Sequence, residues 1–95
     1  MAAYVIYECD VLDQGRYEEY KPKGAASVAA ANGRYLVRGG TVSTLEGDSP
    51  AGRIVVIEFP SMQAALEWYH GEDYANAREI RKGAATTRLY IVDGV

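Results

Sequence analysis

The chain has 95 residues, of which 48% are apolar and 24% charged, and its formal net charge is −3. That length holds one hydrophobic core, so we expect a single domain over residues 1–95. The acidic balance argues against nucleic acid or an anionic membrane surface as a partner, because both call for a basic face. Cys9 is the only cysteine, which excludes an internal disulfide. No apolar run approaches the roughly 20 residues of a membrane span and the N-terminus lacks the basic start of a signal peptide, so we expect a cytoplasmic protein.

The first third of the chain is predicted to form a strand and a helix. Residues 3–11 are rich in β-branched and aromatic side chains, which predicts a strand. Asp13 is a good N-cap, and the helix predicted behind it ends at the Asn32-Gly33 stop signal. Pro22 lacks a backbone donor, so a kink or a restart of the helix is predicted there. Spacings of three and four place these residues on one buried face: Tyr17, Tyr20, Gly24, Val28 and Ala31.

The rest of the chain contains three more predicted strands and a second, interrupted helix. The strands are predicted over residues 34–44, 53–59 and 87–95. Turn-forming residues at 46–52 join the first two of them as a hairpin loop. Ser61 caps the helix, Gly71 interrupts it, and Asp73 can cap the segment that follows. The predicted inward stripe of this helix is formed by Met62, Ala65, Leu66 and Tyr69.

The resulting order βαββαβ predicts a ferredoxin-like α+β sandwich. Its four-stranded antiparallel sheet carries two helices on one face. Residues 4–7, 54–57 and 89–92 are apolar on both faces of their strands, whereas a sheet with one face in water alternates. A second subunit is therefore expected to cover the other face, and we expect a homodimer.

Three motifs point to a known family. They are "GRYLVRGG" at 33–40, "VVIEFPS" at 55–61, and "WY-x-x-x-x-Y" at 68–74. With them the chain resembles the small bacterial family numbered 1330 among the domains of unknown function. The resemblance implies the dimeric α+β barrel superfamily, in which two ferredoxin-like sheets close face to face and each subunit keeps a cleft between sheet and helices. Relatives in that superfamily include cofactor-independent monooxygenases, muconolactone-type isomerases and haem-degrading oxygenases.

Arg38 and Glu58 form the first candidate pair for a site. Pairing these residues across the predicted hairpin places the loop midpoint at residue 48, inside the turn-forming segment. Two interpretations stay open: a cross-strand ion pair, or an Arg38 clamp for a carboxylate or an enolate. Both predict that Arg38 is mostly buried near the mouth of the cleft and contacts Glu58.

Aromatic side chains on the two helices form the second group of candidates. They are either core or the wall of a pocket for a flat ligand, in which a Tyr20 hydroxyl could act as acid or donor. His70 is the only histidine, and it is either an acid–base group or an exposed helix-end residue. The predicted catalytic residues are Arg38, Tyr20 and His70, and the predicted substrate-binding residues are Tyr17, Glu58, Trp68 and Tyr69. One histidine and one cysteine do not supply a metal site, and no cofactor is expected.

Two functions from different classes remain. The leading one is a cofactor-independent enzyme of isomerase, cyclase or monooxygenase type that acts on an aromatic or carbonyl-bearing metabolite in the cleft. The alternative is a non-catalytic stress or regulatory barrel protein whose cleft is simply core. Haem degradation is disfavoured, because Trp68 and His70 are two residues apart and point to different faces of their helix.

Overall fold

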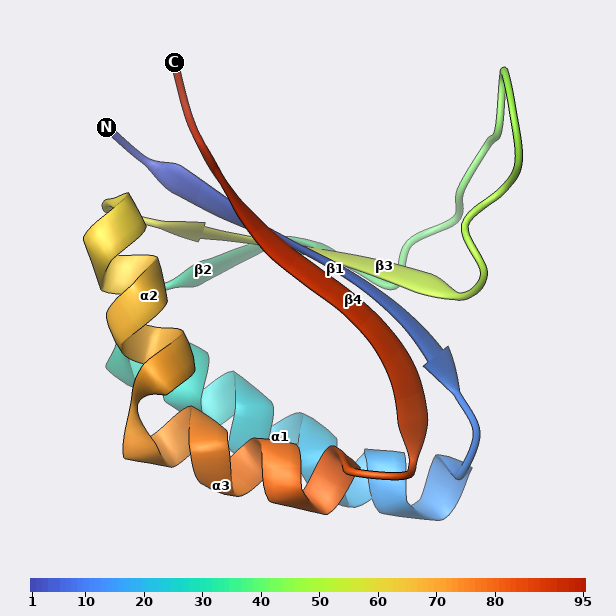
Figure 1. Ribbon diagram of the computed structural model, residues 1–95, viewed down its shortest axis with the longest axis horizontal. Coiled ribbons are helices and arrows are strands. Elements are labelled where there is room, and N and C mark those ends of the chain that lie inside the picture. The colour runs from blue at the N-terminus through green and yellow to red at the C-terminus, as the bar shows by residue number, and fades with distance from the viewer.

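A four-stranded antiparallel sheet carries three helices on one face in the computed structural model, which describes residues 1–95 (Figure 1). The elements are β1 (Ala3–Val11), α1 (Gln14–Ala30), β2 (Arg34–Arg38), β3 (Arg53–Phe59), α2 (Met62–His70), α3 (Glu72–Arg81) and β4 (Ala85–Asp93). The strand order is β2-β3-β1-β4, and every neighbouring pair is antiparallel. The predicted ferredoxin-like sandwich is confirmed, with the second helix divided into α2 and α3.

The core lies between the sheet and the helices. β1 is central in the sheet, and its alternate residues Val5, Tyr7 and Cys9 are buried beneath the helices. The buried face of α1 is the predicted one, with Tyr17, Tyr20, Gly24 and Val28 all covered. This alternation fixes which side chains of each strand can reach a site under the helices.

The helix ends agree with most of the capping predictions. Asp13 accepts a hydrogen bond from the Arg16 amide at 3.2 Å, and Ser61 caps α2 in the same way. α1 continues through Pro22 without a restart. Because Pro22 has no backbone N–H, the carbonyl four residues earlier lacks its helical donor. Pro22 is exposed, so water can reach this carbonyl instead. Asn32, not the glycine after it, takes the left-handed conformation at the end of α1, with φ of 63°. None of the three helices has the length and apolar character that a membrane crossing requires.

Three predicted boundaries are wrong. β4 runs over Ala85–Asp93 instead of residues 87–95, because it pairs with the whole of β1. β2 ends at Arg38 instead of residue 44, because Gly39 has φ of +73° and turns the chain into a loop over residues 39–52. That loop projects beyond the sheet (Figure 1). In α3, Gly71 is the N-cap and the helix begins at Glu72, so Asp73 lies in the first turn.

The predicted inward stripe of α2 is displaced by one residue. Ala65 and Trp68 are the buried residues of this helix, whereas Leu66 is 43% exposed. A helix turns about 100° per residue, so a face centred on Ala65 and Trp68 leaves Leu66 at its edge. Trp68 thereby replaces Tyr69 as the main aromatic contact of α2 with the core.

Gly33, between α1 and β2, is required by close packing. A Cβ at this position would lie 2.7 Å from Phe59 Cε1 and 2.8 Å from Val28 Cγ1. Gly33→Ala is therefore expected to lower the free energy of unfolding by about 1–3 kcal/mol. A Cβ at Gly40 would meet no atom within 4 Å, so Gly40→Ala is the matched control, with a change below about 0.5 kcal/mol. Equilibrium urea unfolding measures both, and equal losses would contradict the packing argument.

Candidate functional site

A cleft opens between the sheet and the helices, inside the core described above. Its cavity volume is only about 30 Å³. That space holds about two water molecules, so a ring-sized ligand enters only if side chains at the mouth rotate outward. The lining residues that matter here are Tyr7, Tyr17, Tyr20, Tyr35, Trp68 and Tyr74, with Lys21, Arg38 and Arg53 as the cations.

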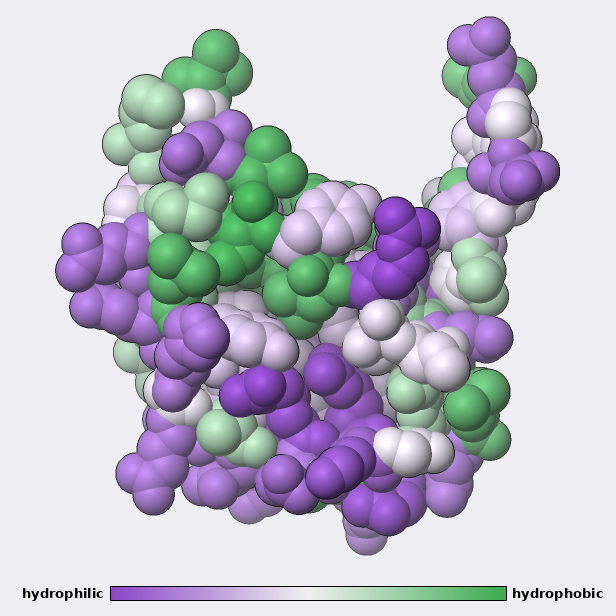
Figure 2. Space-filling model, in the orientation of Figure 1, coloured by the Kyte–Doolittle hydropathy of each residue, from purple (hydrophilic) through white to green (hydrophobic).

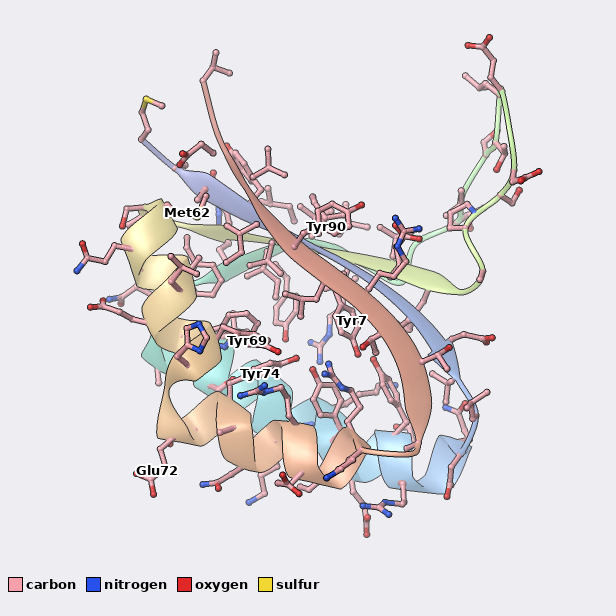
Figure 3. The ribbon with its side chains drawn as sticks, viewed as in Figure 1. Tyr7, Met62, Tyr69, Glu72, Tyr74 and Tyr90 are labelled. Carbon is pink, nitrogen blue, oxygen red and sulfur yellow. The ribbon has the colours of Figure 1, made fainter.

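A hydrogen-bonded network of four tyrosines and one arginine joins α1, α3 and β1 at this cleft. Arg81 Nη1 donates to the hydroxyl oxygens of Tyr7 at 3.1 Å and Tyr74 at 2.9 Å. The hydroxyls of Tyr7 and Tyr17 are 3.3 Å apart, and those of Tyr20 and Tyr74 are 2.7 Å apart. Tyr7 and Tyr74 can be followed in Figure 3, where both lie between the sheet and the helices. The network ties the helical layer to the centre of the sheet.

Arg81 anchors this network. A guanidinium only donates, so Tyr7 and Tyr74 both accept from it. Within each tyrosine pair either hydroxyl can be the donor. When Tyr7 and Tyr74 donate to their neighbours, the hydroxyl protons of Tyr17 and Tyr20 are available to a group in the cleft. Arg81 itself has no carboxylate within ion-pair distance.

The four phenols are neutral donors at neutral pH. Burial is the largest cause that raises the pKa of Tyr7, Tyr17, Tyr20 and Tyr74 above the ordinary tyrosine value. The positive charge of Arg81 lowers the pKa of Tyr7, Tyr20 and Tyr74, but the effect of burial is larger. The arrangement can thus hold hydrogen-bond acceptors, such as a carbonyl or phenolic oxygen, without itself ionising.

The cleft carries positive charge although the chain is acidic overall. Lys21, Arg38 and Arg53 line it, and no aspartate or glutamate does. Arg38 lies over the ring of Tyr35 at 4.5 Å, and Arg53 lies 5.8 Å from the ring centre of Tyr17. Lys21 is paired with Glu18 at 3.1 Å, which leaves the two arginines as the unpaired charges.

The predicted contact between Arg38 and Glu58 is wrong. Glu58 pairs in register with Arg34 and forms an ion pair with it at 2.8 Å, while Arg38 is exposed and lies opposite Val55. The register is irregular at Leu36, which places both Tyr35 and Arg38 on the helix side of the sheet. Glu58 lies on the other side and cannot take part in the cleft.

His70 and Tyr69, also predicted as site residues, do not line the cleft. His70 is exposed, and its ring packs edge-on against Tyr69 with centroids 5.2 Å apart. Tyr69 is half-buried against the core, 5.8 Å from the Tyr74 ring centre, and accepts a hydrogen bond from Arg78 at 2.9 Å. A helix turns about 100° per residue, so the two residues after Trp68 do not share the face with which Trp68 lines the cleft.

The structure does bring Tyr17, Tyr20, Trp68 and Arg38 together at one cleft. Trp68 packs 4.1 Å from the Tyr74 ring centre and donates through Nε1 to Ser27 Oγ at 3.0 Å. Its indole is therefore fixed as a rigid wall.

Several residues of the cleft and its network do not stand out in the sequence: Tyr7, Tyr35, Arg53, Tyr74 and Arg81. Three of them carry a signal all the same. Tyr7 follows Val5 by two residues in β1, so it lies on the same buried face of the strand. Tyr74 and Arg81 are seven residues apart, so they lie on one face of α3. The position of Arg53 depends on the register, which the sequence did not predict correctly.

Solved structures with the same architecture come from bacteria. A protein of unknown function from Rhodopseudomonas palustris is 18% identical over 99% of this chain and 82% of its own, with a TM-score of 0.78. SnoaB, a cofactor-independent oxygenase from Streptomyces nogalater, is 12% identical over 99% of this chain and 93% of its own, with a TM-score of 0.69. No curated protein matches the sequence. These likenesses show the fold, a ferredoxin-like α+β sandwich.

The family follows from the sequence itself. The model of the Domain of unknown function (DUF1330) matches residues 2–95, which is nearly the whole chain. The resemblance noted from the three motifs is thereby confirmed. The chain belongs to the DUF1330 family.

Proposed function

We propose that the protein is a cytoplasmic homodimer that binds a small aromatic or carbonyl-bearing metabolite in each cleft and transforms it without a tightly held cofactor. The observation that carries the proposal is the tyrosine network anchored by Arg81 in an otherwise apolar cleft. Aromatic walls suit a flat ring, and phenol donors suit a carbonyl oxygen. The likeness in fold to a cofactor-independent oxygenase supports this class of chemistry.

The chemistry that these residues support is stabilisation of an enolate. Tyr17 and Tyr20 donate to the substrate oxygen, and two such donors favour the form in which that oxygen is negative. Arg81 holds the donors in place, and Arg38 adds positive charge at the mouth. The cleft has no carboxylate or imidazole among its lining residues. The substrates that fit are therefore phenols and β-dicarbonyl compounds, which are acidic enough to lose their proton to water.

A binding assay with a neutral aromatic ketone tests this proposal. 2-Acetylnaphthalene is expected to quench the fluorescence of Trp68, the only tryptophan, in a saturable manner. Tyr20→Phe is expected to weaken the binding about fivefold, the effect of one neutral hydrogen bond. Tyr69→Phe, on α2 but outside the cleft, is the matched control and should bind like the wild type. Absence of saturable quenching by this ketone would favour the non-catalytic barrel instead.

The homodimer part of the proposal rests on the sheet face without helices. One row of side chains crosses all four strands there, because Val37 pairs with Val56, Val56 with Ile6, and Ile6 with Tyr90. The exposed fraction is 39% for Val37 and 42% for Tyr90. A continuous row of apolar side chains exposed to this extent is unusual on the surface of a monomer. A second copy of the same face would cover the row and satisfy the two-sided apolar pattern of the strands.

The outline of the molecule supports the same partner. The termini and the loop over residues 39–52 project on the side of the sheet away from the helices (Figure 1). Apolar side chains gather between these projections in Figure 2. Charged pairs flank the row, with Arg34 bound to Glu58 on one side of it and Arg88 3.8 Å from Glu8 on the other. An apolar centre with a polar rim is the usual composition of a protein interface.

A further inference from the structure

Two arginines face the cleft from neighbouring strands without any acidic partner. Arg38 pairs in register with Val55, and Arg53 lies two residues before Val55 on the same face of β3. The two side chains are thus diagonal neighbours across the β2–β3 pair. Neither takes part in an ion pair of the chain. Two like charges placed in this way repel unless an anion lies between them.

Arg53 has an unused hydrogen-bond donor beside the cleft. Its Nε is buried and has no acceptor within the chain. Gly39 makes room for it, because a Cβ there would lie 2.9 Å from Arg53 Nη2. A buried donor without an acceptor is costly, so the folded chain retains an unsatisfied group at the edge of an apolar cleft.

We propose that the ligand carries a carboxylate that binds between Arg38 and Arg53 while its aromatic body enters the tyrosine-lined cleft. This rests on the proposed function and names the substrate class of the same site. A guanidinium matches a planar carboxylate with two parallel donors, which an ammonium does not. Lys21 is already paired with Glu18, so the two arginines supply the free positive charge. The anionic end lies at the mouth, and the phenol donors of Tyr17 and Tyr20 meet the ring substituents.

Titration calorimetry with 2-naphthoate and 2-naphthamide tests the carboxylate. The two probes share ring and size and differ in charge, so their ratio of affinities isolates the anionic end. The wild type is expected to bind the acid at least about tenfold more tightly than the amide. Arg38→Gln/Arg53→Gln is expected to lose this preference and to bind the two probes equally. Lys23→Gln removes an exposed charge of α1 outside the cleft and should keep the wild-type preference.

Each outcome is decisive. Equal affinities in the wild type, or a preference that survives in the double variant, would overturn the carboxylate proposal while the amide still reports a working cleft. Failure of both probes to bind the wild type would overturn the proposed function together with this inference.

If the double variant does not fold, two other measurements replace it. The exposed Arg38→Gln variant should lose part of the preference, and the wild-type preference should shrink between 20 mM and 500 mM salt, both by about threefold or more. A ratio of acid to amide affinity that changes neither in Arg38→Gln nor with salt would contradict the proposal.

Discussion

Raising the pH above about 10 is expected to unfold the protein in one cooperative step. Tyr7, Tyr17, Tyr20 and Tyr74 all have pKa values raised by burial from the ordinary value of 10.0. A group whose pKa is raised on folding contributes stability that is fully present below its unfolded pKa. That contribution is lost as the pH rises toward the folded pKa, because the unfolded chain releases the proton first.

The magnitude follows from the number of buried phenols. Each contributes a loss of about 1.4 kcal/mol per pH unit, and four together about 5 kcal/mol per pH unit. A small domain has about 5–15 kcal/mol in total, so unfolding should be complete within roughly one to three pH units. Tyrosinate absorbance at 295 nm and far-UV circular dichroism should change together. Tyr17→Phe keeps the ring but removes one titrating group, so its stability should fall less steeply with pH. Gradual ionisation of all tyrosines with intact secondary structure would contradict the network.

Val56→Asp is expected to convert the proposed homodimer into monomers. Val56 lies at the middle of the apolar row, between Val37 and Ile6. An uncompensated charge in an interface costs about 3 kcal/mol or more, and a two-fold symmetric interface contains it twice. The dissociation constant should therefore rise by about four orders of magnitude. Sedimentation velocity at several concentrations measures the change, and circular dichroism verifies that the monomer is folded.

A control variant separates this effect from a general effect of charge. Ala26→Asp makes the same kind of change on the exposed side of α1, away from the sheet, and should leave the dimer intact. Val92→Lys, at a position 50% exposed near the end of β4, should weaken the dimer with the opposite charge. A wild-type chain that sediments as a monomer at all concentrations, or a Val56→Asp dimer as tight as the wild type, would refute the face-to-face arrangement.

The sequence predicted the fold well because the signals for it are local. The β-branched and aromatic content of residues 3–11, the cap at Asp13 and the spacing of Tyr17 and Tyr20 each depend on a few neighbouring residues. Gly71 as a helix break is a local signal of the same kind. The elements and their faces were therefore readable without knowledge of the partners that they meet in space.

The candidate site was predicted only in part, because it depends on register and on long-range contacts. The irregular register at Leu36 moves the residues after it to the opposite face of β2. Arg38 therefore lies at the cleft, whereas Glu58 lies on the other face of the sheet. Arg81 is 74 residues from Tyr7, and no local pattern indicates that one anchors the other. His70 was predicted as a catalytic residue because it is the only histidine. Whether it lies in the cleft depends on which face of α2 turns inward. Register and helix rotation are tertiary properties, and these are where the predictions failed.

The cleft as a ligand site is the central claim, and a crystal structure of the protein grown with 2-naphthoate tests it most directly. The predicted result is a naphthalene ring between Trp68 and Tyr20, a carboxylate within hydrogen-bond distance of both Arg38 and Arg53, and Tyr35 rotated outward to admit it. A cleft still closed by its own side chains, with the probe absent or bound elsewhere, would contradict it.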